Sequence, residues 1–321
     1  MSRLVIGTRG SALALWQSEH VRAALLAEYP ELEISLQVIR TKGDKILDSA
    51  LSKIGDKGLF TKEIENVLLD GSIDLAVHSL KDLPTELQQD LTIAAITIRE
   101  DPADVLISKN GQTLDKLTSG AKVLTGSLRR QAQLLHRRGD LEVRDIRGNV
   151  QTRLKKFEAS DAQAIIFAKA GLVRLNLAEC ITERLDPAEF LPACGQGALA
   201  IEIRKGDSRM ADLLRPLDHL NSRATTAAER VFLGRLGGGC RVPVGAFARI
   251  SGPDRTMSIT GMVANLDGSV LLQDTISSSF AGVDSAIALG TELAERLLSQ
   301  GCQEILEQIL GQSPVEPEPL P

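Results

Sequence analysis

The stretch Leu4-Val5-Ile6-Gly7-Thr8-Arg9-Gly10-Ser11 contains the pattern that decides the fold. Residues 4–8 are a short apolar run, which predicts a buried strand, and residues 11–28 continue as a helix. The same alternation of strand, polar turn and helix recurs along the first two thirds of the chain, and it predicts α/β units with largely parallel sheets. The further strands are expected at 34–40, 73–77, 91–98, 104–108, 122–124, 142–145 and 164–168, and the helices at 61–69 (capped by Thr61), 127–138 and 149–159.

The pattern changes after residue 217. A helix at 221–236 precedes three strands at 244–250, 256–263 and 270–276, whose short connections predict an antiparallel meander, and helices follow at 283–299 and 304–310. We therefore expect an α/β protein of three domains, the third a small α+β domain with a three-stranded antiparallel sheet. The expected boundaries are 1–98 with 198–216 for domain 1, 99–197 for domain 2 and 217–311 for domain 3. The loop 191–197 is rich in helix breakers and is expected to cross between domains, and the tail 312–321 is expected to be disordered.

Composition excludes several classes of function. The 321 residues carry a net charge of -5 and only 3% aromatic residues, which argues against a nucleic-acid partner. The four cysteines and four histidines show neither disulfide nor metal-ligand spacing, so no metal is expected. No signal peptide is apparent, and no apolar run approaches the roughly 18 residues of a membrane span. These features predict a cytoplasmic protein that does not bind membranes.

Arginines recur where predicted helices begin. Arg9 precedes Gly10-Ser11, the stretch Ser127-Leu128-Arg129-Arg130 opens the helix at 127–138, and Arg147 and Arg153 surround the start of the helix at 149–159. Because cations at helix N-termini oppose the helix dipole, this placement does not stabilise the helices, and an anionic ligand would resolve the conflict. Guanidinium groups match carboxylates with paired N–H donors, so several such positions indicate a polyanion. The alternative is a set of solvated surface arginines.

Two other segments are candidates for chemistry. The segment from Asp74 to Pro84 predicts a strand that ends in a loop carrying Lys81 and Asp82, where the lysine would bind an anion and keep the aspartate ionised. A surface ion pair is the alternative. The basic, glycine-rich loop 53–60 is either a lid over an anionic site or a solvated turn.

Cys240 ends the glycine run Gly237-Gly238-Gly239 and is followed by Arg241. Glycines leave a neighbouring sulfur unshielded, and an adjacent arginine favours the nucleophilic thiolate. The pattern indicates an attachment point, with a small buried cysteine in a tight turn as the alternative.

The motifs together resemble the porphobilinogen deaminase family, whose members are also called hydroxymethylbilane synthases. The resemblance runs from residue 4 to about residue 310 and is carried by Thr8-Arg9-Gly10-Ser11, Gly58-Leu59-Phe60-Thr61, Ala76-Val77-His78-Ser79-Leu80-Lys81-Asp82-Leu83-Pro84, Ser127-Leu128-Arg129-Arg130, Arg147-Gly148-Asn149, Gly195-Gln196-Gly197 and Gly238-Gly239-Cys240. It implies that the first two domains resemble periplasmic binding proteins. It also implies an enzyme that joins porphobilinogen units into linear hydroxymethylbilane, releases ammonia and uses a dipyrromethane primer made from its own substrate.

The resemblance also assigns roles to residues. It implies a thioether between dipyrromethane and Cys240, and a catalytic Asp82 that binds pyrrole N–H groups and stabilises an azafulvene cation. Each pyrrole ring carries an acetate and a propionate, so the growing chain is a polycarboxylate. The cofactor-binding positions would be Lys81, Asp82, Ser127, Arg129, Arg130 and Arg147, and the substrate-binding positions Arg9, Ser11, Arg153, Arg174 and Phe60 of the lid. A monomer is the family expectation.

Three positions depart from the family pattern. Gly126 lacks a hydroxyl that the family usually has there, Lys169 stands where a small or apolar residue is usual, and Cys194 replaces a common apolar residue. Lys169 is expected either to bind a carboxylate or to be a surface lysine, and Cys194 to be structural. The competing functions are a non-catalytic anion-binding module of the periplasmic-binding type and an inactive homologue. A tethering thiol such as Cys240 argues against the binding module, and retention of both Asp82 and Cys240 argues against the inactive homologue.

Overall fold

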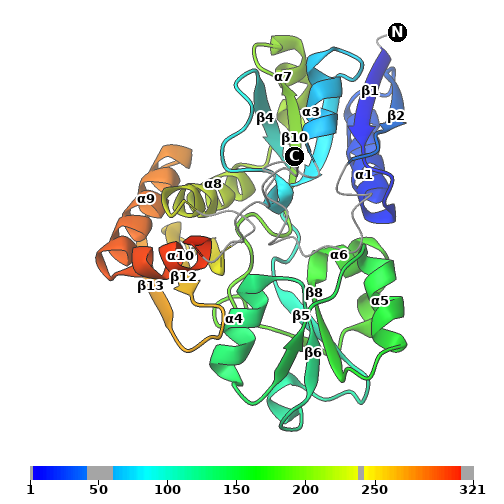
Figure 1. Ribbon diagram of the computed structural model, residues 1–321. Helices are drawn as coiled ribbons and strands as arrows, with labels where there is room; N and C mark the ends of the chain where they lie inside the picture. The colour runs from blue at the N-terminus through cyan, green and yellow to red at the C-terminus, as the bar shows by residue number, and fades with distance from the viewer. Residues whose placement is uncertain (1–2, 42–60, 238–241, 312–321) are drawn as a thin grey trace, which may run out of the picture.

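The computed structural model describes residues 3–41, 61–237 and 242–311. Their strands form two five-stranded sheets and one three-stranded sheet. Figure 1 shows the first sheet and its helices at the top, the second at the bottom and the third group to the left. This arrangement confirms the predicted mixed α/β class with a separate antiparallel sheet.

The first sheet has the strand order β2-β1-β3-β10-β4 and is covered on both faces. Leu4 and Ile6 of β1 pack into the same core as Val21 of α1 and Met210 of α7, whereas Val5, between them, packs on the opposite face against the core that contains Ile64 of α3. This alternation follows from the two-residue repeat of a strand. The elements are β1 (Arg3–Thr8), α1 (Ala12–Glu28), β2 (Glu33–Val38), α3 (Lys62–Leu69), β3 (Leu75–Ser79), β4 (Leu91–Ile96), β10 (Leu199–Arg204) and α7 (Ser208–Leu214), with 3-10 turns η2 (Leu80–Asp82) and η5 (Arg215–Leu217).

The second sheet has the order β7-β6-β8-β5-β9. Leu106 of β5 faces the core shared with Leu134 of α4, and its neighbours Val105 and Ile107 face the core that contains Phe157 of α5. The elements are β5 (Asp104–Ser108), η3 (Leu114–Lys116), β6 (Lys122–Leu124), α4 (Leu128–Arg137), β7 (Glu142–Arg144), α5 (Val150–Glu158), β8 (Ala164–Ala168), α6 (Lys169–Arg174), η4 (Ala178–Cys180) and β9 (Glu183–Arg184).

Both sheets are mixed, so the expectation of largely parallel sheets was wrong in part. Strand β1 pairs in parallel with β2 and β3, and β6 pairs in parallel with β7 and β8. Strand β10 is antiparallel to both β3 and β4, and β5 is antiparallel to both β8 and β9. These two strands are the ones that the chain enters after crossing from the other sheet, once between β4 and β5 and once between β9 and β10. The crossings therefore reverse the local strand direction.

The third sheet is the predicted meander, with β12 antiparallel to β11 and β13. Helices α8 and α9 pack together beside it, and Phe232 is fully buried in their common core. Gly290 of α9 permits this close packing, because a β-carbon there would lie 2.2 Å from the carbonyl oxygen of Ala228 on α8. The elements are α8 (Leu220–Arg235), β11 (Val244–Ser251), β12 (Thr256–Ala264), β13 (Leu271–Ser279), α9 (Val283–Ser299) and α10 (Cys302–Gly311).

Several details of the structure differ from the predictions, and some predictions concern residues that the structure does not describe. Strands β9 and β10 were not predicted as separate elements. Thr61 stands at the N-cap of α3 but makes no side-chain capping bond, so its expected capping role was wrong. Phe60, Cys240, the loop 53–60 and the tail 312–321 fall in or extend into segments outside the described residues. Across residues 3–41, 61–237 and 242–311, none of the helices has the length and apolar character that crossing a membrane would require.

Candidate active site

The end of strand β3 carries the central pair of the site. Leu80 is fully buried and its amide donates to the carbonyl of Ala198, which fixes the turn η2 just after the strand. Lys81 is partly buried in this turn, and Asp82 is exposed. Asp82 forms no ion pair or side-chain hydrogen bond with any residue that the structure describes. Its side chain lines an open hollow.

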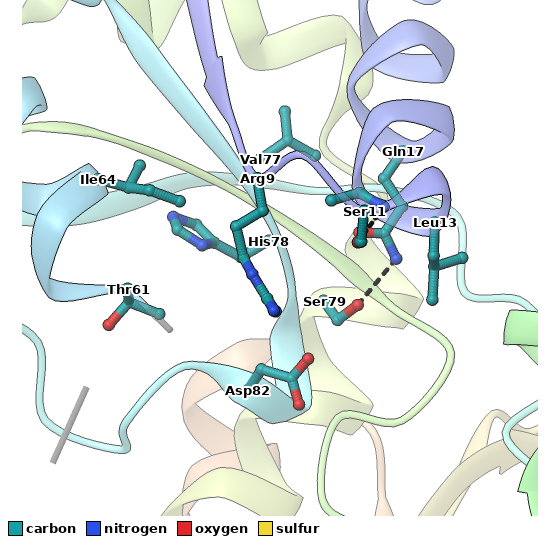
Figure 2. A pocket seen from close by; sticks show the side chains of 11 residues that line it. Arg9, Ser11, Leu13, Gln17, Thr61, Ile64, Val77, His78, Ser79 and Asp82 are labelled. Carbon is teal, nitrogen blue, oxygen red and sulfur yellow. Dashed lines mark hydrogen bonds between the residues drawn. The ribbon is translucent and has the colours of Figure 1, made fainter. Parts of the chain in front are cut away.

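An open hollow lies beside Asp82. Figure 2 shows the guanidinium of Arg9 directed toward Asp82 across this hollow. The amide of Gln17 donates to Ser79 Oγ at 2.8 Å, which orients the serine at the strand end. Ser11 also lines the hollow, and its hydroxyl accepts from Ala14 N at 3.2 Å as the N-cap of α1. The remaining lining residues are Leu13, Ala14, Thr61, Ile64, Val77 and His78.

Helix α4 brings two adjacent arginines to a buried carboxylate. Ser127 caps this helix by accepting from Arg130 N at 3.4 Å. Asp104, at the start of β5, is fully buried and accepts from Arg129 Nη1 and Arg130 Nη2, both at 2.7 Å. Asp104 thus partly resolves the conflict between these cations and the helix dipole, a conflict that the sequence analysis assigned to a ligand alone. Arg129 Nη1 also donates to the carbonyl of Leu191.

Helix α5 supplies a third guanidinium. Arg153 lies over the ring of Phe167, with 4.7 Å between the guanidinium carbon and the ring centroid. Its Nε is buried and has no hydrogen-bond partner among the described residues, and the same holds for Arg130 Nε. Arg147, just before this helix, donates to Asp145 Oδ2 at 3.1 Å. Unsatisfied buried donors are costly, so Arg130 and Arg153 favour an acceptor supplied from outside the described chain.

The pKa shifts show that these groups from both sheets act on one another. Burial lowers the pKa of Lys81 to about 8, with the charge of Asp82 opposing and that of Arg130 assisting this shift. Burial lowers the pKa of Arg153 to about 10, and the positive charge of Arg130 adds to the effect. Cations crowded in this way repel one another and bind an anion more strongly than a solvated lysine or arginine would. The local charge balance therefore suits a polycarboxylate.

Arg174 of α6 lies between the two α/β units. Its Nη2 donates to the carbonyl of Gly197 at 2.6 Å, and its guanidinium carbon lies 5.8 Å from the ring centroid of Trp16 on α1. Burial lowers its pKa to about 10, with Glu100 opposing. Figure 1 shows α6 directly below α1. Arg174 therefore links its own helix α6 to the loop 191–197 and to helix α1. Its predicted contact with substrate stays a prediction.

The three positions that depart from the family pattern have distinct surroundings. A β-carbon at Gly126 would lie 2.7 Å from the carbonyl oxygen of Ile146, so the missing side chain makes room for the neighbouring turn. Lys169 Nζ pairs with Asp101 Oδ2 at 2.8 Å, so a carboxylate of the chain itself holds this lysine. Cys194 is buried in the core of the third unit, as expected for a structural cysteine.

Sequence reasoning missed several residues that hold the site together. Asp104 is one of them, although an aspartate at the head of an otherwise apolar strand is a visible signal of a buried ion pair. Gln196 and the buried pair Arg99–Glu229, with 2.8 Å between Nη1 and Oε1, are others. Glu229 also accepts from the backbone amides of Gly195 and Ala248, which joins the loop 191–197 to the third sheet. Such contacts depend on how the units pack against one another, so local sequence patterns do not predict them.

The fold and the site together define a class of protein: a two-sheet α/β protein with an added α+β unit and a site rich in cationic side chains. Residues 4–212 match the family model described as "Porphobilinogen deaminase, dipyromethane cofactor binding domain", and residues 224–299 match "Porphobilinogen deaminase, C-terminal domain". The chain belongs to the porphobilinogen deaminase family.

Curated relatives agree with this assignment over nearly the whole length. Porphobilinogen deaminase of Chloroherpeton thalassium is 51% identical over 307 residues, which cover 95% of this chain and 97% of the relative. Porphobilinogen deaminase of Syntrophotalea carbinolica is 50% identical, over 95% of this chain and 95% of the relative. Porphobilinogen deaminase of Moorella thermoacetica is also 50% identical, over 98% of this chain and 98% of the relative.

Solved structures resemble the chain only broadly. A periplasmic binding protein of Salmonella typhimurium with high arginine specificity covers 68% of this chain, with 92% of its own length aligned, at 15% identity and a TM-score of 0.39. A LysR-family transcriptional regulator also covers 68% of this chain, with 70% of its own length aligned, at 14% identity and a TM-score of 0.42. The family assignment rests on the sequence matches.

Proposed function

We propose that this chain is a hydroxymethylbilane synthase, a transferase that joins porphobilinogen units stepwise into linear hydroxymethylbilane and releases ammonia. One observation carries the assignment: curated porphobilinogen deaminases are about half identical to this chain over at least 95% of its length. The product is the linear tetrapyrrole from which haem and chlorophyll are built. A non-catalytic anion-binding module, the alternative from the sequence, finds no support in these matches.

The described residues fit the dipyrromethane cofactor that the matched family domain binds. The buried Nε atoms of Arg130 and Arg153 need acceptors, and the carboxylates of a pyrrole chain provide them. When bound, dipyrromethane supplies the pyrrole carbon to which the first substrate is joined. We assign its attachment to Cys240, which lies outside the described residues, and its carboxylates to Lys81, Ser127, Arg129, Arg130 and Arg147.

Asp82 is the catalytic residue of this proposal. Its exposed carboxylate accepts hydrogen bonds from the pyrrole N–H of porphobilinogen and stabilises the positive charge that develops as ammonia leaves. A fixed negative charge beside the developing cation lowers the barrier, because it needs no reorganisation when the charge appears.

The second set of positions binds the incoming substrate. Arg9 and Ser11 line the hollow beside Asp82, and Arg153 reaches the site from the second sheet. We assign the acetate and propionate of porphobilinogen to these residues, with Arg174 at the connection between the two units. Phe60, outside the described residues, is assigned to a lid on the expectation from the sequence.

We further propose domain boundaries at 1–98 with 198–216, 99–197 and 217–311, which the two chain crossings and the separate third sheet support. We propose a monomer located in the cytoplasm that binds neither nucleic acid nor membranes. The free cysteines Cys180, Cys194 and Cys302 and the acidic net charge of -5 support the location and the lack of a nucleic-acid partner.

A turnover assay tests the function and the role of Asp82 together. Purified protein supplied with porphobilinogen is expected to release one ammonia per unit consumed and to yield a linear tetrapyrrole detectable by mass spectrometry. Asp82→Asn should fold normally and lower kcat by about 10²- to 10³-fold, because the developing cation loses its counter-charge. Asp70→Asn, which changes an exposed carboxylate that accepts from the amide of nearby Ser72 and is not assigned to the site, is the control and should behave as wild type. Absence of tetrapyrrole from wild type contradicts the function, and near-normal turnover of Asp82→Asn removes that residue from the mechanism.

A further inference from the structure

Gln196 connects the two halves of the site through its side-chain amide. It lies in the crossing between β9 and β10 and is almost fully buried, at 1% exposure. Its Oε1 accepts from Lys81 Nζ at 3.2 Å, and its Nε2 donates to Asp104 Oδ1 at 2.8 Å and to the carbonyl of Pro102 at 2.7 Å. One neutral amide therefore contacts the lysine beside Asp82 and the carboxylate that holds Arg129 and Arg130.

These partners allow only one orientation of the amide. An ammonium group only donates hydrogen bonds, so Lys81 requires the oxygen of Gln196. A carboxylate and a backbone carbonyl only accept, so Asp104 and Pro102 require the nitrogen. The backbone of Gln196 is also fixed, because its carbonyl accepts from Arg99 Nε at 2.8 Å and Arg99 is paired with Glu229. The amide is thus held in place from both sides.

We propose that Gln196 is a positioning residue for the reaction, which keeps Lys81 charged and directed into the site and ties it to the Asp104–arginine cluster. This role rests on the proposed function, because that function assigns Lys81 to bind cofactor carboxylates. Gln196 acts through Lys81 and makes no contact with substrate in this account. Within the described chain it provides the hydrogen-bond acceptor of Lys81 Nζ.

The electrostatics explain why Lys81 needs such an acceptor. The pKa of Lys81 is lowered to about 8, first by burial and then by the charges of Arg130 and Arg129, against the opposing charges of Asp82 and Asp104. An ammonium with this pKa is close to losing its proton at physiological pH. A hydrogen bond to the charged form favours that form, so the Gln196 carbonyl helps to keep Lys81 protonated.

A neutral side chain suits this position better than an acidic one. A carboxylate at residue 196 would attract Lys81, but its second oxygen would face Asp104 Oδ1 and the carbonyl of Pro102, both of which are acceptors. An amide satisfies both sides without added charge. This chemistry explains a glutamine where two α/β units meet.

The test uses Gln196→Met in the holoenzyme, with Gln163→Met as the matched control. Methionine keeps the side-chain length and removes all three side-chain hydrogen bonds. Gln163 Oε1 accepts a hydrogen bond from Lys122 N at 2.7 Å on the second sheet, so Gln163→Met also removes a side-chain hydrogen bond. Gln163 is not assigned to the site. Lysines labelled with ¹³C at Cε report the titration of Lys81 by NMR, with its signal assigned from the spectrum of Lys81→Arg.

Gln196→Met should move the titration midpoint of Lys81 down by about one pH unit, the scale of one hydrogen bond to a charged group. It should also lower kcat/KM for porphobilinogen about tenfold, because Lys81 no longer holds the cofactor carboxylates in the position that the reaction needs. Gln163→Met should leave the Lys81 midpoint unchanged. An unchanged midpoint in a folded Gln196→Met overturns the proposal.

Should Gln196→Met fail to fold, Gln196→Asn withdraws the amide by one methylene group and is judged by the same midpoint. The titration needs no turnover, so it tests the role of Gln196 even for a protein that makes no tetrapyrrole. A failure of the wild-type protein to make tetrapyrrole would overturn the proposed function and not the role of Gln196.

Discussion

Replacing Asp104 with asparagine removes a negative charge from between two buried guanidinium groups and hardly alters the shape of the side chain. Asp104 is fully buried, and the side chains of Arg129 and Arg130 are only 5% and 7% exposed. In Asp104→Asn one amide oxygen still accepts a hydrogen bond, but the amide nitrogen faces a second donor. Two cations then lie in the interior without their counter-charge, which is costly because water cannot solvate them.

The expected loss of unfolding free energy follows from these contacts. Removing one partner of a buried ion pair costs about 3–5 kcal/mol. Arg129 keeps its bond to the carbonyl of Leu191, and Arg130 keeps its bond to the carbonyl of Ile166, so the lower end, about 3 kcal/mol, is expected. That is a large part of the roughly 5–15 kcal/mol that stabilises a typical protein.

Urea unfolding followed by circular dichroism measures this loss, and peptide-level hydrogen exchange locates it in β5 and α4. Asp140→Asn is the control, because Asp140 is solvent-exposed in its pair with Arg138 and such pairs contribute little. The reasoning is refuted if the two variants unfold at the same urea concentration with the same exchange pattern.

The loss should also depend on pH in a defined direction. Burial acts to raise the pKa of Asp104, but the charges of Arg129 and Arg130 outweigh it and hold this pKa well below its usual range. A carboxyl group whose pKa is lowered by folding stabilises the protein above its unfolded pKa, about 3.9, and loses that contribution as pH falls toward the folded value. The difference between wild type and Asp104→Asn should therefore be constant from about pH 5 to 8 and shrink below about pH 4.

Two further predictions concern buried groups near the site. Burial, with Glu229 assisting, raises the pKa of the Cys194 thiol, so iodoacetamide should modify Cys194 only after unfolding, and rapid labelling in native protein, seen by peptide mass spectrometry, would contradict its burial. Trp16 is the single tryptophan of the chain, so Arg174→Met should change the protein's fluorescence by removing the guanidinium above the Trp16 ring. The control Arg184→Met, which breaks a pair with Asp101, should leave the fluorescence unchanged. Equal emission spectra for the two variants would rule out the contact between Arg174 and Trp16.

The regular elements were largely predictable from local sequence patterns. The strands Asp104–Ser108, Lys122–Leu124 and Ala164–Ala168 coincide with apolar runs bounded by polar turns, and the predicted bounds are those of the structure. The insertion of β10 between β3 and β4 was not predictable in this way, because a crossing chain segment selects its partners by tertiary packing. Strand direction in both sheets follows from the two crossings, so the sheets were predicted as more parallel than they are.

The site was predictable where its residues follow strand ends and helix starts. The structure places Lys81 and Asp82 directly after β3 and Ser127 at the N-cap of α4, as these patterns indicate. The bond between Asp104 and the two arginines was not predictable, because it depends on how α4 packs against β5. For the same reason the contacts of the Gln196 amide with both sheets were not predictable, although Gly195-Gln196-Gly197 is one of the motifs that carry the family resemblance.

Intact-mass measurement tests most directly the central claim, that a pyrrole primer is held covalently in a site of clustered cations. Wild-type protein, produced where porphobilinogen is available, should be heavier than its sequence by two porphobilinogen units less the ammonia lost, and Cys240→Ala should lack this increment. A wild-type mass equal to that of the bare sequence, or an increment that persists in Cys240→Ala, would contradict the account.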